Sequence, residues 1–205
     1  MKRGCKALIF CALTAGFVWC GSLLADRQIL NEELIRLHVV ADSDSREDQD
    51  RKLLVRDAVL ESLKRDMAGL TDVQAARDYI QENLPKIRRV AVRALESVGC
   101  YDPVRVQLCK EAFDTRQYDT FSLPAGVYEA LRITIGAGEG RNWWCVAFPS
   151  LCLPATSEGF AEAAAGAGFP QTLRDALTGQ EEYQLRFRLL DLLGQWENSR
   201  LLKAQ

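Results

Sequence analysis

Residues 126–152 show the clearest alternation of hydrophobic and polar positions in the chain. Within 127–135 the odd positions are mostly aliphatic, which is the period of a half-buried β-strand. A glycine-rich break at 136–140 follows, and a second β-rich run occupies 143–148. Two such runs around a short glycine-rich break predict a β-hairpin at the centre of the fold.

Similar patterns predict the elements that surround this hairpin. Residues 34–40 and 104–108 alternate like strands, whereas three segments between them have helical spacing. Helices are expected from Ser45, which can cap the first one, to about Met67, and from Asp72, which with Thr71 can cap the second, to about residue 84. Pro85 allows either a break or a third helix from about 85 to 98. We therefore expect an α+β fold, in which a small, mainly antiparallel sheet packs its long helices on one face.

The N-terminus carries the pattern of an export segment. A short basic lead precedes residues 7–25, which contain no charge. This pattern predicts that residues 1–25 are a signal peptide or an N-terminal membrane anchor, since about 20 apolar residues span a bilayer. A buried helix of a cytosolic protein is the alternative. Polar residues 26–33 predict a stalk, and the predicted extracytoplasmic domain comprises 26–153.

The chain changes character after this domain. Residues 154–180 are rich in alanine and glycine and poor in apolar periodicity, so they predict a mobile linker with a short helix around Phe160. Residues 181–205 return to helical spacing and predict an amphipathic helix. Three placements are open for this helix: on its own domain, on a partner or on a membrane.

Four cysteines follow the export segment, and an oxidising compartment would allow three pairings. The strand that contains Cys109 carries it too far from Cys100 for a bond. Cys145 and Cys152 flank a turn, so they form the predicted disulfide, and Cys100 and Cys109 remain unassigned. Four buried thiols are the alternative.

The sequence contains no recognisable catalytic constellation. The formal net charge of −2 argues against nucleic acid as a partner. His38 is the single histidine, and no GxSxG nucleophile motif accompanies it. The glycines at 136–140 follow a strand and precede another strand, so they favour a turn over a phosphate loop. Hence neither an enzyme nor a cofactor is predicted.

Acidic residues after the first strand are the candidate metal ligands. Asp42, Asp44 and Asp48 have part of the spacing of a calcium loop, but the glycine and distal glutamate of an EF-hand are missing. Helix capping is the preferred interpretation of these residues, and no metal site is predicted.

Three blocks of sequence resemble one known family. They are LIRLHVVADSDS at 34–45, LPAGVYEALR at 123–132 and GRNWWCVAFPSLC at 140–152. In this order, and after an export segment, they resemble the stage II sporulation protein R family of endospore-forming bacteria. The resemblance covers roughly residues 27–153.

The resemblance implies an exported signal. Such a protein leaves the forespore, enters the space between forespore and mother cell, and activates a membrane-embedded aspartic protease of the mother cell. The protease then processes the sigma-E precursor. The implied partner is this protease, with membrane contact through an uncleaved N-terminal segment.

Exposed residues around the predicted hairpin are the candidate contacts for this partner, because aromatic and arginine side chains dominate binding hot spots. The first surface comprises Glu129, Arg132, Arg141, Asn142 and one of Trp143 or Trp144. The second comprises His38, Asp42 and Asp44. Both tryptophans could instead be core residues. An exported hydrolase or cell-wall-binding domain that uses His38 and a nearby aspartate is the main functional alternative, and a purely structural envelope protein is another.

Overall fold

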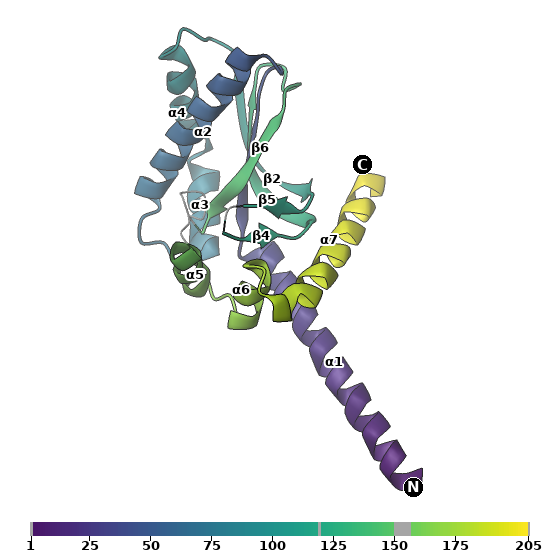
Figure 1. Ribbon diagram of the computed structural model, residues 1–205. Helices are drawn as coiled ribbons and strands as arrows, with labels where there is room; N and C mark the ends of the chain where they lie inside the picture. The colour runs from purple at the N-terminus through teal and green to yellow at the C-terminus, as the bar shows by residue number, and fades with distance from the viewer. Residues whose placement is uncertain (1, 119, 150–156, 205) are drawn as a thin grey trace.

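The computed structural model describes residues 2–118, 120–149 and 157–204, and it has the predicted α+β class (Figure 1). A four-stranded sheet lies between two groups of helices. In chain order the elements are α1 (Lys2–Glu32), β1 (Ile35–Val40), α2 (Arg46–Asp66), α3 (Val73–Glu82), α4 (Leu84–Glu96), β2 (Val104–Phe113), β3 (Arg116–Gln117), β4 (Ser122–Leu123), β5 (Gly126–Ile135), β6 (Asn142–Phe148), α5 (Ser157–Gly166), α6 (Gln171–Leu177), a 3₁₀ turn (Glu181–Tyr183) and α7 (Gln184–Ala204).

The predicted hairpin of β5 and β6 is wrong, because β1 lies between these two strands. The strand order is β2-β5-β1-β6, with β1 parallel to β5 and antiparallel to β6. Every residue of β1 is buried, so this strand is most stable where both of its edges and both of its faces are covered. The link at 136–141 is long enough to cross it, since strands are spaced about 4.8 Å apart and each extended residue spans about 3.3 Å.

One face of the sheet packs against α2, α3 and α4, as predicted. Its core contains alternate residues of β1 and β5, including Leu37, Val39, Leu131 and Ile133, all of them fully buried. The expected caps are also present. Ser45 Oγ accepts a hydrogen bond from the Asp48 amide at 3.1 Å, and Asp72 Oδ2 accepts one from the Ala75 amide at 2.9 Å.

Helices also cover much of the other face, which corrects the expectation of helices on one side. The predicted linker contributes α5 and α6, and the buried Phe160, Phe169 and Leu173 join Tyr128 and Phe113 in a second core. Widely spaced large side chains are enough to anchor helices whose remaining residues are small. α7 completes this layer. A Cβ atom at Gly194 would lie 1.6 Å from the Ala125 carbonyl oxygen, so glycine is what allows α7 to approach the sheet so closely.

The predicted stalk at 26–33 is instead part of the fold. α1 continues through it, and its C-terminal end is fixed to α7 by two ion pairs. Asp26 Oδ2 lies 2.5 Å from Arg186 Nη2, and Arg27 Nη2 lies 2.5 Å from Glu197 Oε2. The N- and C-terminal helices therefore depend on one another for their positions.

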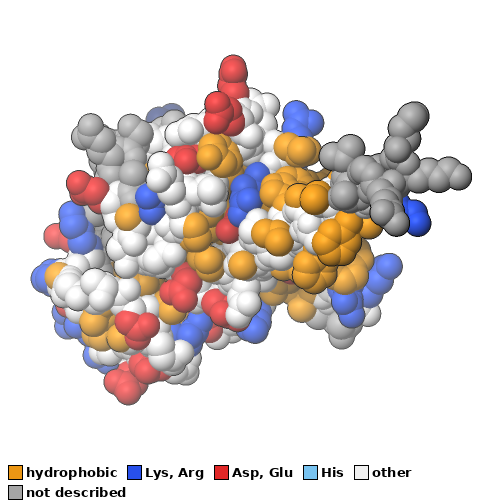
Figure 2. Space-filling model, turned by 90° about the horizontal axis from the view of Figure 1, so that it is seen from below, with side chains coloured by type: hydrophobic (Ala, Val, Ile, Leu, Met, Phe, Trp, Pro, Cys, Tyr) orange, Lys and Arg blue, Asp and Glu red, His pale blue; other side chains and the backbone are white. Residues whose placement is uncertain are grey.

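The N-terminal half of α1 projects from the sheet and its helices (Figure 1). Its exposed side chains include Phe10, Leu13, Phe17 and Val18, and hydrophobic side chains gather around this end of the molecule (Figure 2). Among the described residues, no helix combines the length and apolarity that crossing a membrane requires.

Candidate functional site

Four of the predicted contact residues lie on one face of the sheet. His38 of β1 pairs in register with Arg132 of β5 and with Trp144 of β6, so the three side chains point to the same side. Asn142 lies two residues before Trp144 and shares its face. This polar part of the sheet continues the face that α1 and α7 cover near Tyr128. We call His38, Glu111, Arg132, Asn142 and Trp144 the open-face cluster.

Hydrogen bonds hold His38 at both ring nitrogens. Nδ1 lies 2.9 Å from Glu111 Oε2, and Nε2 lies 2.9 Å from Asn142 Oδ1. Arg132 Nη1 donates to the other carboxylate oxygen, Glu111 Oε1, at 2.7 Å. Glu111 thus bridges the histidine and the arginine and fixes their side chains relative to one another.

Trp144 lies next to His38, on the side away from Arg132 and Glu111. Aromatic and cationic side chains contact its ring. The two ring centroids are 5.5 Å apart, and the guanidinium carbon of Arg116 lies 3.5 Å from the Trp144 ring centroid. The Phe113 ring centroid lies 6.3 Å from the Trp144 ring centroid. On the Phe113 ring, the guanidinium carbon of the buried Arg36 lies 4.3 Å from the centroid. Such contacts restrict rotamers, so the cluster presents a pre-organised surface.

Sequence reasoning missed Glu111 and Arg116. The predicted strand stopped near residue 108, whereas β2 continues to Phe113 and brings Glu111 onto the face that His38 occupies. Alternation from Val104 to Phe113 carries this signal, because the polar residues at 105, 107 and 111 share one parity. Arg116 belongs to a two-residue strand, which is too short for a periodic pattern.

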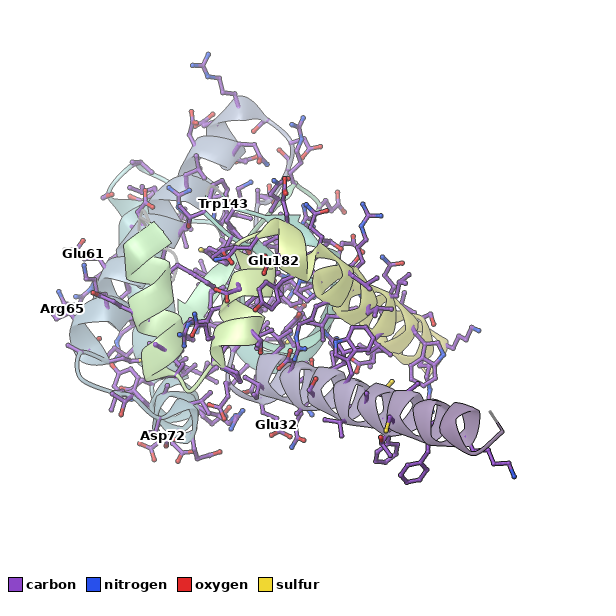
Figure 3. All side chains as sticks on the ribbon, turned by 60° about the horizontal axis from the view of Figure 1, so that its bottom comes forward. Glu32, Glu61, Arg65, Asp72, Trp143 and Glu182 are labelled. Carbon is purple, nitrogen blue, oxygen red and sulfur yellow. The ribbon has the colours of Figure 1, made fainter. Side chains whose placement is uncertain are left out.

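The other predicted contacts lie elsewhere. Glu129 points to the face of α3, where its Oε2 lies 2.5 Å from Arg77 Nε. Trp143, which is 38% exposed, also faces the side that α2, α3 and α4 cover. The guanidinium carbon of Arg56 in α2 lies 4.4 Å from its ring centroid. Figure 3 shows Trp143 on the side of the molecule away from the projecting end of α1. The two tryptophans therefore face opposite sides of β6.

Asp42, Asp44 and Arg141 lie at the end of the sheet, in the two loops that follow β1 and β5. Asp42 Oδ1 accepts a hydrogen bond from the Ala137 amide at 2.5 Å, and Asp44 Oδ1 accepts one from the Arg141 amide at 2.7 Å. A Cβ atom at Gly136, where φ is +57°, would lie 2.0 Å from Asp42 Oδ1. These aspartates thus hold the crossing loop in place, and neither has a hydrogen bond to His38 among the described contacts.

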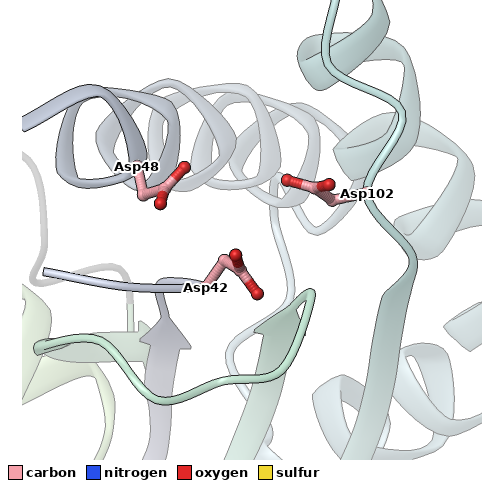
Figure 4. Close-up of side chains that lie close together, drawn as sticks. All are labelled: Asp42, Asp48 and Asp102. Atoms are coloured by element: carbon pink, nitrogen blue, oxygen red, sulfur yellow. The ribbon is translucent and has the colours of Figure 1, made fainter. Parts of the chain in front are cut away.

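Asp42 also belongs to a group of three carboxylates with Asp48 and Asp102, whose nearest oxygens lie within 4.8 Å of one another (Figure 4). Each is already engaged with a protein donor. Asp48 accepts from Ser45 Oγ at 2.9 Å and from Arg51 Nη1 at 3.0 Å, and Asp102 accepts from the Cys100 thiol at 3.1 Å. Hydrogen bonds from Ser43 and Ser45 lower the pKa of Asp48. These contacts agree with the capping interpretation.

The described residues include three of the four cysteines that follow the export segment. Cys100 and Cys109 are free thiols, and burial raises the pKa of both. Cys145 is buried in β6. Cys152 lies outside the described residues, so its pairing with Cys145 stays a prediction.

The open-face cluster has the features of a binding surface. Within the described part of the chain, the ring nitrogens of His38 form hydrogen bonds with Glu111 and Asn142, and neither has a hydrogen bond to a serine, threonine or cysteine. Nucleophilic catalysis requires such a partner within hydrogen-bond reach of the base. The surface of the cluster comes mainly from Asn142, which is exposed, and from Arg132, whose side chain is 35% exposed, whereas His38 is only 8% exposed beneath them.

Acidification should weaken the cluster. Burial alone would raise the pKa of Glu111, but the hydrogen bonds and charges of His38 and Arg132 hold that pKa below its usual value. A lowered pKa means that its stabilising contribution is complete above about pH 4.3, the unfolded value, and is lost as the pH falls through the folded value. Urea unfolding at pH 7 and pH 3 should therefore show a smaller acid loss for Glu111→Gln than for the unaltered chain.

The matched control is Glu96→Gln, because Glu96 is an exposed residue of α4. This variant should lose as much stability in acid as the unaltered chain. Equal acid losses for Glu111→Gln and the unaltered chain would contradict the role of this carboxylate.

Comparisons with known proteins now identify the family. A family model described as stage II sporulation protein R (spore_II_R) matches residues 31–158, which include β1 to β6. The chain is 39% identical over 131 residues to the stage II sporulation protein R of Bacillus subtilis (strain 168), an alignment of 64% of this chain and 58% of that relative. The chain thus matches little more than half of the relative's length, and no solved structure matches. This chain belongs to the stage II sporulation protein R family.

Proposed function

We propose that this chain is an exported signal of endospore formation, and that it activates a membrane-embedded aspartic protease of the mother cell. The protease would then process the sigma-E precursor. Family membership carries this proposal. The site adds a physical argument, since the open-face cluster is a rigid polar and aromatic surface in which His38 lacks a nucleophile among the described residues.

A ligand of this kind activates its receptor only through differential affinity. The open-face cluster would have to contact the active state of the protease more favourably than the resting state. Side chains that are already fixed lose little conformational entropy on binding, so more of the contact energy is left to favour one state. Export of the chain through its N-terminal segment, as a signal peptide or an anchor, belongs to the same proposal.

Co-expression in a non-sporulating host tests this function. The protease and the sigma-E precursor are produced with and without this chain, and immunoblotting reports precursor length. We expect the shortened form only when the chain is present. A precursor that stays intact beside an exported, folded chain would overturn the proposal, as would shortening without the chain.

His38 distinguishes the proposed ligand from the exported hydrolase. His38→Gln keeps a side chain that can hydrogen-bond Glu111 and Asn142 but cannot act as a general base. In the co-expression assay this variant should retain precursor processing within about fivefold, because the change in one hydrogen bond contributes roughly 1 kcal/mol.

The control for this variant is Asp50→Asn, a change at an exposed residue of α2. A drop of more than about a hundredfold for His38→Gln alone, with unchanged folding by circular dichroism, would favour catalysis instead.

A further inference from the structure

A second polar feature lies beside the open-face cluster, on the same face of the sheet. Arg105 and Gln107 of β2 pair in register with Thr134 and Arg132 of β5, so four side chains form a square across two strands. They line a pocket of about 230 Å³ together with Ala137 and Gly138 of the crossing loop. None of the six residues that line this pocket is acidic.

Donors dominate this pocket. Arg132 uses Nη1 to bind Glu111, but its Nε is buried and has no hydrogen-bond partner. Arg105 has one long contact, from Nη2 to the Gly136 carbonyl oxygen at 3.5 Å. The amide of Gln107, whose Nε2 also makes a long contact of 3.5 Å to Cys109 Sγ, and the hydroxyl of Thr134, a residue only 8% exposed, add further donors. The Arg132 side chain as a whole is 35% exposed and Arg105 is an exposed residue, so both guanidinium groups keep surface that an anion can reach.

The nearby carboxylates do not supply this anion. Glu111 is shared between His38 and Arg132, and Asp42 accepts a hydrogen bond from the backbone amide of Ala137. Gly138 allows the crossing loop to lie close to Thr134, because a Cβ atom there would lie 2.4 Å from the Thr134 methyl carbon. Arg105 offers a guanidinium fork and Arg132 adds the nitrogen that is neither buried nor bonded to Glu111, so together they match the planar, two-oxygen geometry of a carboxylate.

We propose that this pocket binds an acidic side chain of a protein partner, with Arg105 and Arg132 as the carboxylate-binding residues. The pocket adjoins Trp144 and His38 through Arg132, so an acidic residue could enter it while the rest of the partner covers the open-face cluster. Naming a protein as the source of the carboxylate rests on the proposed function, but carboxylate binding itself can be measured without the protease.

Calorimetry on the full chain tests the pocket. The probe is the capped peptide Ala-Glu-Ala-Glu-Ala, and its matched partner has glutamine at both acidic positions. We expect saturable binding of the acidic peptide only. Arg105→Gln should weaken this binding about tenfold, since a charge-assisted bond is worth roughly 1.5 kcal/mol or more. Arg89→Gln, the same change at an exposed residue of α4, should leave it unaltered.

Several results would overturn the proposal. Equal behaviour of the two peptides, or of Arg105→Gln and Arg89→Gln, would exclude carboxylate recognition by this pocket. Tighter binding of inorganic phosphate would assign the pocket to another anion, and glutarate that binds as tightly as the peptide would exclude a protein segment as the preferred source. If the acidic peptide binds but Arg105→Gln still activates the protease fully, the pocket binds carboxylates but does not bind an acidic residue of the protease. This outcome would overturn the proposed role of the pocket and leave the proposed activation of the protease standing.

Discussion

Replacing Asp26 by asparagine should lower the free energy of unfolding by about 3–5 kcal/mol, because it leaves a buried arginine without its counter-ion. The side chains of Asp26 and Arg186 are only 3% and 10% exposed. Besides the carboxylate, the hydrogen-bond acceptors of Arg186 among the described residues belong to Ser22, at 3.3 Å and 3.4 Å. Urea unfolding followed by far-UV circular dichroism measures the loss.

A double replacement separates charge from packing. Asp26→Leu with Arg186→Met removes both charges, so it should cost less than Asp26→Asn alone. Asp50→Asn, at an exposed position of α2, should change stability by less than about 0.5 kcal/mol. A loss for Asp26→Asn no larger than for Asp50→Asn would show that α1 and α7 are not joined as the structure indicates.

Phe160→Ala should destabilise the chain by about 3–5 kcal/mol, the usual cost of truncating a buried aromatic side chain. Phe160 has no exposed surface, and its ring stacks on Phe121 with the centroids 4.4 Å apart. The removed ring would leave a cavity between α5 and the segment before β5. A mobile linker predicts no such cost, so chemical denaturation of this variant decides between the two descriptions.

The matched control is Phe10→Ala, because Phe10 is 68% exposed on the projecting part of α1. This variant should unfold at the same urea concentration as the unaltered chain. If Phe160→Ala behaved like Phe10→Ala, α5 would contribute nothing to the fold.

Local patterns predicted several individual elements of the central part of the chain well. Alternation located β1 and β5, and the caps at Ser45 and Asp72 marked where α2 and α3 begin. Strand order was not accessible in this way. Nothing in the local pattern of 126–148 indicates that a distant strand will insert, because that outcome depends on how much of β1 can be buried.

The second core was missed for a related reason. Alanine and glycine dominate α5 and α6, so their periodicity is weak, and the few aromatic anchors matter only once Tyr128 and Phe113 provide a surface to bury them. Asp26 and Arg27 likewise look like solvated charges until α7 supplies Arg186 and Glu197. Both features depend on contacts between segments far apart in the sequence.

The candidate site was predicted in part. His38, Arg132, Asn142 and Trp144 were singled out as binding residues, and the structure brings them to one face, while it separates Glu129 and Trp143 to the other. Glu111 joins them because β2 is longer than its central hydrophobic pattern indicated. Register, which only the folded sheet defines, decides which of the candidates can act together.

Site-specific crosslinking between this chain and the protease is the most direct test of the proposed signal. A photoreactive p-benzoylphenylalanine replaces Trp144 in the open-face cluster or, as the control, Arg89 on the opposite side of the molecule, and both variants must still support precursor processing. We expect position 144 to capture the protease and position 89 not to. Capture from position 89 alone, or from neither position while processing continues, would contradict the assignment of this face to the partner.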